Sequence, residues 1–166
     1  CHLTRADVAA ARDGQIFVVL PPEPPEATAA DPSLETDGAF ARQLSAYRGM
    51  LGRRLYLAAH HLYRGDDGKR LARLAALAER AGMPLLATND VHCHAPERRP
   101  LQDVLTCIRE HCTIRTAGWR LHANAERHLK PPAEMARLFR DYPDAVARTG
   151  EIAEACRFSL DELRYD

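Results

Sequence analysis

Three short apolar runs, each separated from the next by a helix-like stretch, constrain the fold of this chain more than any other feature. The runs lie at 16–20, 55–59 and 85–88, and turn residues bound each of them. Apolar, β-branched runs of this length predict buried strands. Apolar residues at helical spacing fill the two intervals, which are long enough for crossovers between parallel neighbours. The sequence therefore predicts an α/β fold with a parallel sheet, either open or closed into a barrel.

Capping residues indicate where several helices begin and end. Thr4 is expected to cap a short first helix, and Asp66 with Asp67 to cap a helix over 68–80 that Gly82 ends. After His94 the pattern becomes helical without any strand run, with helix starts expected at Pro96, at Pro132 and near Asp141, and an irregular stretch over 112–132. A proline-rich loop is expected over 21–34. We place a domain boundary near residue 95.

Composition and charge exclude several classes of protein. Lys plus Arg and Asp plus Glu both number 23, which argues against a strongly basic module that binds mainly by neutralising phosphates. No apolar run approaches the length of a membrane span, and no signal peptide pattern is present. We therefore expect a cytoplasmic protein whose five cysteines are free thiols. Because the chain starts at Cys1 rather than at Met, we expect a piece of a longer polypeptide.

Candidate metal ligands follow two of the predicted strands. Asp90 and His92 are two residues apart after the run at 85–88, so strand alternation would direct both side chains to one side. A carboxylate and an imidazole in one cleft can bind a divalent metal, although a turn followed by a surface histidine explains the same residues. His60 and His61 follow the preceding strand and face opposite sides, so at most one of them can join that site.

A basic region with one tryptophan lies in the second half of the chain. Its members are Arg109, Arg115, Arg120, Arg127 and Lys130, with Trp119 among them. Arginine with an aromatic residue can bind nucleic acid, whereas a solvated charged face is the simpler explanation. Cys107 lies at helical spacing from apolar neighbours, which predicts a core position.

Four segments together resemble one known family. Residues 84–92 followed by 98–109, and 127–139 followed by 151–165, resemble the catalytic alpha subunit of bacterial DNA polymerase III. Within that family the segments are most similar to the error-prone, damage-inducible branch. The resemblance is strong from about residue 54 to residue 166.

The resemblance implies that residues 1–95 are the C-terminal portion of a PHP (polymerase and histidinol phosphatase) domain. Such a portion is a partial, distorted (β/α) barrel with parallel strands, and the family's barrel holds divalent metal (zinc, manganese or magnesium). Asp90 and His92 match ligands of the family's fourth metal motif, and His61, or else His60, matches the third. The first two motifs have no counterpart in this chain. With only part of the barrel present, we also expect an unpaired apolar sheet edge and self-association.

Residues 96–166 resemble the helical segment that leads into the polymerase palm, whose catalytic aspartates lie further on. The resemblance thus implies a DNA-directed DNA polymerase for damage-induced translesion synthesis, with no catalytic residue in this chain. DNA, deoxynucleotides, a sliding clamp and mutagenesis accessory proteins are the partners it implies. Two alternatives are a free-standing PHP-type metal-dependent phosphoesterase and a structural scaffold that has lost its metal.

Overall fold

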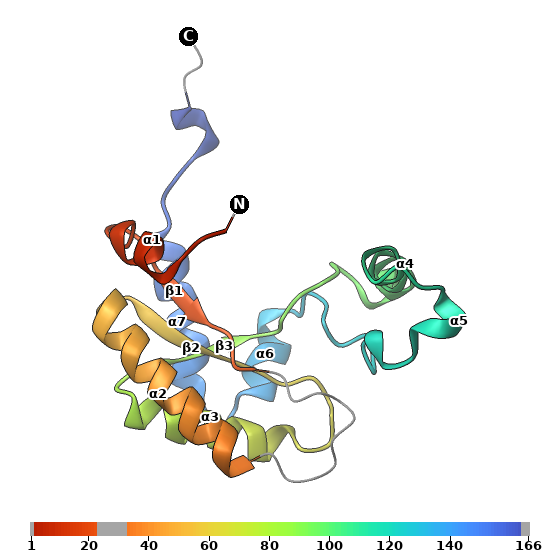
Figure 1. The fold of residues 1–166 in the computed structure, drawn as a ribbon, viewed down its shortest axis with the longest axis horizontal. Coiled ribbons are helices and arrows are strands. Elements are labelled where there is room, and N and C mark those ends of the chain that lie inside the picture. Colours follow the sequence, from red (N-terminus) through yellow and green to blue (C-terminus); the bar gives the residue numbers. More distant parts are fainter. Residues whose placement is uncertain (1, 23–32, 164–166) are drawn as a thin grey trace.

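The computed structural model describes residues 2–22 and 33–163, and it is a mixed α/β structure (Figure 1). Its sheet has three strands in the order β1 (Phe17–Val19), β2 (Leu55–His60) and β3 (Leu85–Thr88), and both strand pairs are parallel. All three strands fall on the predicted apolar runs. The predicted parallel sheet, followed by helices, is therefore confirmed.

Among the described residues, three helices lie before and between the strands: α1 (Arg5–Ala10), α2 (Ser33–Leu51) and α3 (Asp67–Arg80). Thr4 caps α1 as predicted: its side chain accepts a bond from the Asp7 amide, while the Asp7 carboxylate accepts one from the Thr4 amide at 2.7 Å. Gly82 follows α3 with a φ of +61°, a left-handed conformation that glycine adopts without strain. Most of the proline-rich loop predicted over 21–34 lies outside the described residues.

The predicted cap of α3 requires a correction. Asp66 occupies the N-cap position, but its side chain makes no capping bond. The Asp67 carboxylate instead accepts bonds from the backbone amides of Leu62 at 2.7 Å, Arg64 at 2.6 Å and Gly65 at 3.2 Å. Because the loop before the helix folds back on itself, its amides point at this one carboxylate. Asp67 therefore stabilises the loop after β2 rather than the start of α3.

Beyond residue 95 the described chain forms helices and turns. They are η1 (Pro96–Arg98), α4 (Arg99–Arg109), α5 (Ile114–Ala117), η2 (Gly118–Arg120), α6 (Pro132–Leu138), α7 (Pro143–Ala155) and η3 (Leu160–Glu162). The starts at Pro96 and Pro132 are as predicted, and the stretch expected to be irregular contains the short α5 and η2. None of the helices that the structure describes is long and apolar enough to cross a membrane.

One hydrophobic core joins the sheet to helices from both halves of the chain. Leu57 of β2 and Leu85 of β3 pack with Leu44 of α2, Leu77 of α3 and Phe139, which follows α6. Helix α7 also lies along β3, where the Arg148 guanidinium donates a bond to the Leu85 carbonyl at 2.9 Å. This core includes side chains from both sides of residue 95, so the two halves of the chain pack against each other. The domain boundary near residue 95 stays a prediction.

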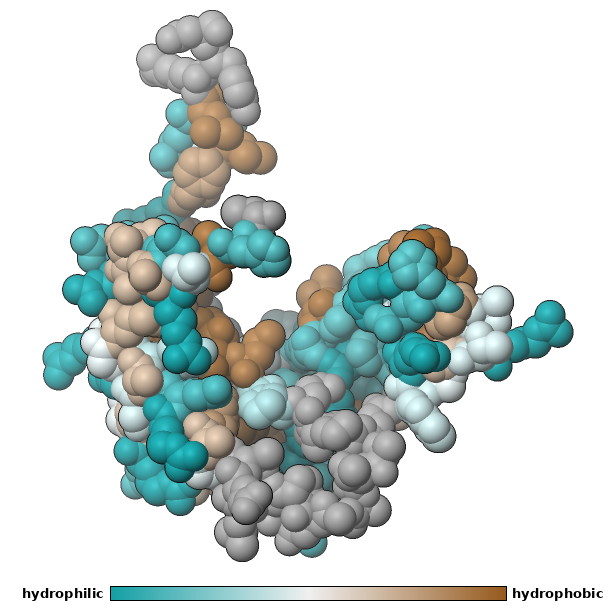
Figure 2. Space-filling view, in the orientation of Figure 1, coloured by the Kyte–Doolittle hydropathy of each residue, from teal (hydrophilic) through white to brown (hydrophobic). Residues whose placement is uncertain are grey.

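The segment from η1 to η2 projects away from the sheet (Figure 1). We call residues 96–120 the arm, and the sheet with α1, α2, α3, α6 and α7 the body. Apolar side chains gather on α4 at the surface of the arm in Figure 2, and those exposed there are Leu101, Val104, Leu105 and Ile108.

Candidate functional site

The two candidate ligand clusters lie at the same end of the sheet. His60 is the last residue of β2 and pairs in register with Thr88, the last residue of β3. Asn89 and Asp90 follow directly. The carboxyl ends of neighbouring parallel strands lie at the same edge of a sheet. His60 at the end of β2 therefore lies next to the start of the segment that follows β3.

Asp90 and His92 meet, although not through strand alternation. Asp90 lies beyond β3 with a φ of +43°, a left-handed conformation that is uncommon for a residue other than glycine. This turn brings Asp90 Oδ1 to 3.5 Å from His92 Nε2. The other carboxylate oxygen, Oδ2, forms an ion pair with Arg127, whose residue is only 5% exposed. Asp90 therefore already neutralises the charge of the buried Arg127 guanidinium.

His61 turns toward the loop that Asp67 stabilises. Its Nδ1 lies 4.0 Å from Asp67 Oδ1, and its ring stacks edge-on against Tyr63 with 4.9 Å between centroids. Burial by itself would raise the pKa of Asp67, but backbone hydrogen bonds from Leu62 and Arg64, together with His61, hold that pKa below its ordinary value. His61 thus faces a buried carboxylate. His60 is itself buried.

These side chains do not by themselves fit a complete metal centre. Among residues 2–22 and 33–163, no group of three histidine, cysteine or acidic side chains lies close enough to hold a metal ion. Asp90 and His92 offer two donors, and one of the two is ion-paired, whereas a closed zinc site needs four ligands. Metal binding by Asp90, His92 and His61 stays a prediction.

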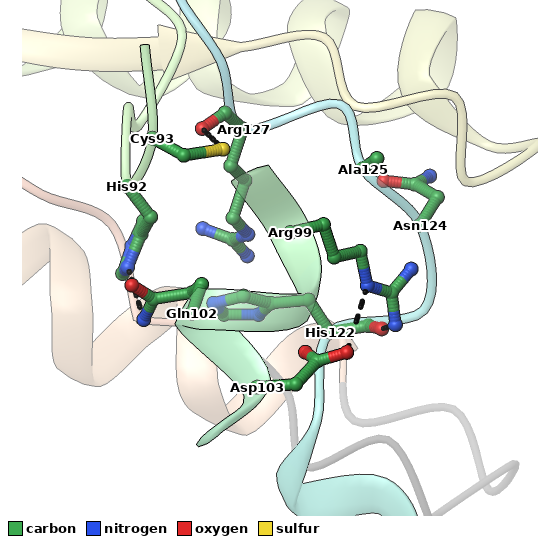
Figure 3. Close-up of a pocket in the computed structure, with 9 residues that line it drawn as sticks. All are labelled: His92, Cys93, Arg99, Gln102, Asp103, His122, Asn124, Ala125 and Arg127. Atoms are coloured by element: carbon green, nitrogen blue, oxygen red, sulfur yellow. Dashed lines mark hydrogen bonds and ion pairs between the residues drawn. The ribbon is translucent and has the colours of Figure 1, made fainter. Parts of the chain in front are cut away.

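A small cavity lies between α4 of the arm and the segments that precede and follow the arm (Figure 3). It measures about 10 Å³, which is room for roughly one water molecule. The His92 ring stacks edge-on against His122 with 4.8 Å between centroids, and its Nδ1 lies 3.5 Å from Gln102 Nε2. Arg99 forms an ion pair with Asp103 at 3.4 Å and also donates to the His122 carbonyl. The cavity is too small for a nucleotide or a phosphate ester.

Two asparagines fasten the segment after the arm to the strand ends. The Asn89 amide donates to the carbonyl oxygens of Glu126 at 2.8 Å and His128 at 2.6 Å. Asn124 donates to the Leu62 carbonyl at 2.6 Å. Sequence reasoning missed these contacts. The single available signal was the place of Asn89 beside Asp90, and no spacing rule connects Asn89 with 126–128.

Four residues of the basic region are our predicted nucleic-acid contacts, namely Arg115, Arg120, Arg127 and Lys130. They divide into two environments. Arg127 pairs with Asp90, and Lys130 pairs with Glu126 at 2.8 Å with a side chain only 2% exposed. Arg115 and Arg120 are exposed on the arm, beside Trp119, which is 79% exposed. The predicted role in nucleic-acid binding is untested for all four, but only the two on the arm present their charge to solvent.

Fold and site together define an α/β chain with a parallel sheet, an aspartate–histidine pair at a strand end and a helical second half. No protein-family model matches the chain. Curated proteins named error-prone DNA polymerase do match it: the one from Caulobacter vibrioides is 48% identical over 164 residues, which is 99% of this chain and 14% of that protein. The one from Brucella abortus is 47% identical over 166 residues, again 99% of this chain and 14% of that protein.

The error-prone DNA polymerase of a Bradyrhizobium species is 48% identical over 165 residues, covering 99% of this chain and 13% of that protein. The chain is therefore homologous to a segment of error-prone DNA polymerases. It spans about 14% of the length of the curated relatives that it matches. The resemblance found in the sequence is confirmed, and it extends over residues 1–53 as well.

Proposed function

We propose that this chain is part of a DNA-directed DNA polymerase that performs error-prone translesion synthesis after DNA damage. The observation that carries the proposal is the similarity to error-prone DNA polymerases over 99% of the chain. DNA and deoxynucleotides are the substrates of the whole enzyme. Nucleotidyl transfer belongs to parts of the polypeptide outside this chain, and no residue of the chain is assigned a catalytic role. A sliding clamp, mutagenesis accessory proteins and a cytoplasmic location follow from the resemblance alone.

Primer extension by the full-length polypeptide tests this proposal. The expected result is extension on an undamaged template and past an abasic site, with frequent misincorporation. A full-length protein that extends no primer on either template would contradict the assignment. One that extends faithfully and stops at the lesion would restrict the function to ordinary synthesis.

Within this enzyme we propose that Arg115 and Arg120 contact the DNA backbone. Their support is their exposure on the arm beside Trp119. Replacing both by alanine in the full-length protein should weaken DNA binding and lower the slope of its salt dependence by about one for each phosphate that is no longer neutralised. Arg140→Ala is the matched control, because the Arg140 side chain is 81% exposed on the body. Equal binding by the double variant and the control would rule out the contact.

We further propose that residues 1–95 are the C-terminal part of a PHP domain, with Asp90, His92 and His61 in its divalent-metal site. Support comes from the 3.5 Å contact between Asp90 and His92 at a strand end and from the parallel sheet. Because the described residues supply too few donors, the remaining ligands must come from elsewhere in the full-length polypeptide.

Calorimetric titration of zinc or manganese tests the metal proposal. We expect weak binding by the 166-residue chain and tighter binding by the full-length protein. His92→Ala should reduce the full-length affinity, whereas His94→Ala, at a neighbouring exposed histidine, should not. Equal affinity in the chain and the full-length protein would show that no upstream ligand completes the site.

The aspartate–histidine pair also favours a second candidate, a free-standing PHP-type phosphoesterase. Incubating the chain alone with manganese and p-nitrophenyl phosphate separates the two. The polymerase proposal expects no hydrolysis, since the chain holds an incomplete set of metal ligands. Hydrolysis that is abolished in His92→Ala would favour the phosphoesterase.

A further inference from the structure

Helix α4 ends in a backbone arrangement that brings two cysteines together. The amide of Cys112 donates to the carbonyl of Cys107 at 3.0 Å, and the amide of His111 donates to the carbonyl of Ile108 at 3.3 Å. His111 has a φ of +51°, so the chain turns through a left-handed residue after the helix. This pair of nested bonds defines a Schellman motif.

A Schellman motif places the side chains at the two ends of its longer bond against each other. Apolar residues usually make this contact, but here both positions are cysteines. A disulfide needs α-carbons about 4.4–6.8 Å apart, and the 3.0 Å backbone bond from Cys112 to Cys107 brings the backbones of these two residues close together. The Cys112 thiol is also close enough to Cys107 to raise the pKa of the Cys107 thiol. The backbone has therefore already brought together the residues that a disulfide would join.

The two thiols differ in their access to solvent. Cys107 is 6% exposed, whereas Cys112 is half-buried. Burial raises the pKa of the Cys107 thiol, and the neighbouring Cys112 thiol raises that pKa further. An oxidant dissolved in water therefore meets Cys112 first, while Cys107 lies beside it as a protonated thiol.

We propose that Cys107 and Cys112 form a reversible oxidation site for hydrogen peroxide. The Cys112 thiolate attacks one peroxide oxygen; the O–O bond breaks, the Cys112 sulfur becomes a sulfenic acid, and the other oxygen leaves as water after taking up a proton. The Cys107 sulfur then attacks the Cys112 sulfur, forming the S–S bond. The S–O bond breaks, and the hydroxyl leaves with the Cys107 proton as a second water. Overall, two thiols are oxidised to one disulfide, and one peroxide is reduced to two waters.

The disulfide would close the corner between two helices of the arm. Cys112 is followed by Thr113, which forms a capping box at the start of α5. A bond from Cys112 back to Cys107 would fix the left-handed turn at His111 and hold α5 against the end of α4. Reduction by a dithiol restores both thiols.

Mass spectrometry of the full-length protein provides the test. The protein is treated with hydrogen peroxide, its remaining thiols are alkylated, and it is digested with trypsin. Because Arg109 lies between the two cysteines, digestion separates residues 99–109 from 110–115. Peroxide should produce these two peptides as one disulfide-linked species, with two fewer free thiols in the protein, and dithiothreitol should separate them.

Two variants control the measurement. Cys112→Ser should abolish the linked species, whereas Cys156→Ser, at an exposed cysteine of α7's C-terminal end, should leave it unchanged. The proposal is overturned if peroxide drives Cys112 to sulfinic acid without forming the link. Disulfides from Cys112 to Cys93 or Cys156 in amounts equal to the Cys107 link would overturn it as well, because proximity would then not direct the reaction.

Discussion

Helices α3 and α4 carry the same kind of apolar pattern but have opposite surroundings. Each presents apolar residues at helical spacing along one side. The side chains on α3 are between 2% and 8% exposed: Leu71, Leu74 and Leu77. Those on α4 are between 45% and 65% exposed: Leu101, Val104, Leu105 and Ile108. Helix α3 packs on the sheet of the body, and α4 stands in the projecting arm (Figure 1).

The difference shows what an amphipathic pattern can and cannot predict. The pattern states that a helix has a face to bury, but the partner that buries it is decided elsewhere in the polypeptide. An exposed apolar face of this kind is typical of an interaction surface. Within the part of the chain that the structure describes, nothing covers the face of α4.

Truncation of a core side chain should separate the two regions most clearly. Phe139, which is 1% exposed, packs under the sheet, so Phe139→Ala should lower the free energy of unfolding by about 3–5 kcal/mol. Leu105→Ala on the arm should change it by no more than about 0.5 kcal/mol. Urea unfolding followed by circular dichroism measures both. Similar reductions in the two variants would show that α4 is buried in the folded chain.

Replacing Asn124, which bonds the segment after the arm to the loop after β2, should have an intermediate effect on the free energy of unfolding. Asn124→Ala removes the donor to the Leu62 carbonyl and should cost about 1–3 kcal/mol, since a partly buried acceptor is left without its partner. Gln102→Ala is the control, because its 3.5 Å contact with His92 is long. Hydrogen exchange should show faster exchange at 121–128 in Asn124→Ala than in the control. Unchanged exchange there would mean that other contacts hold the arm.

Acid should destabilise the body through Asp67. The pKa of this carboxyl is lower in the folded chain than its ordinary value, so it contributes stability above its unfolded pKa of about 3.9. That stability is lost as the pH falls through the lower folded pKa. Asp67→Asn should therefore flatten the fall in stability below about pH 4.

Unfolding curves measured between acid and neutral pH provide this comparison. Asp144→Asn is the matched control, because its carboxylate is 86% exposed on α7, and it should retain the acid dependence of the parent chain. An acid dependence that is the same in the Asp67 and Asp144 variants would contradict a stabilising role for the buried carboxylate.

Introducing a charge on the exposed apolar face of α4 should change the free energy of unfolding least, but it should change the oligomeric state of the chain. Leu105→Glu should reduce self-association of the chain with little effect on unfolding. Val18→Glu, at an exposed position of the edge strand β1, tests the alternative that the open sheet edge drives association. Light scattering measures the molar mass of both variants. A larger reduction in Val18→Glu would assign the association to the sheet.

The secondary-structure elements that depend on local chemistry can be predicted from the sequence. Apolar runs between turn residues predicted the three strands, and helices of crossover length predicted that the strands run parallel. Thr4, Gly82 and Pro132 predicted where helices begin or end, because a cap, a left-handed turn and a missing amide act within a few residues. The segments at 84–92, 98–109, 127–139 and 151–165 carried the resemblance to the polymerase family, which similarity over 99% of the chain confirms.

Which side chains meet across long stretches of sequence depends instead on the path of the folded chain. Spacing predicted Asp90 and His92 on one side of a strand end, but a left-handed turn at Asp90 is what brings them together. The fold also brings the buried Arg127 to Asp90 and turns Lys130 inward toward Glu126. Asp67 likewise binds the loop before its helix instead of capping it. Local patterns carry no information about such contacts, because they depend on the path of the chain between the partners. For the same reason the pattern of α4 could not show that its apolar face lies in solvent.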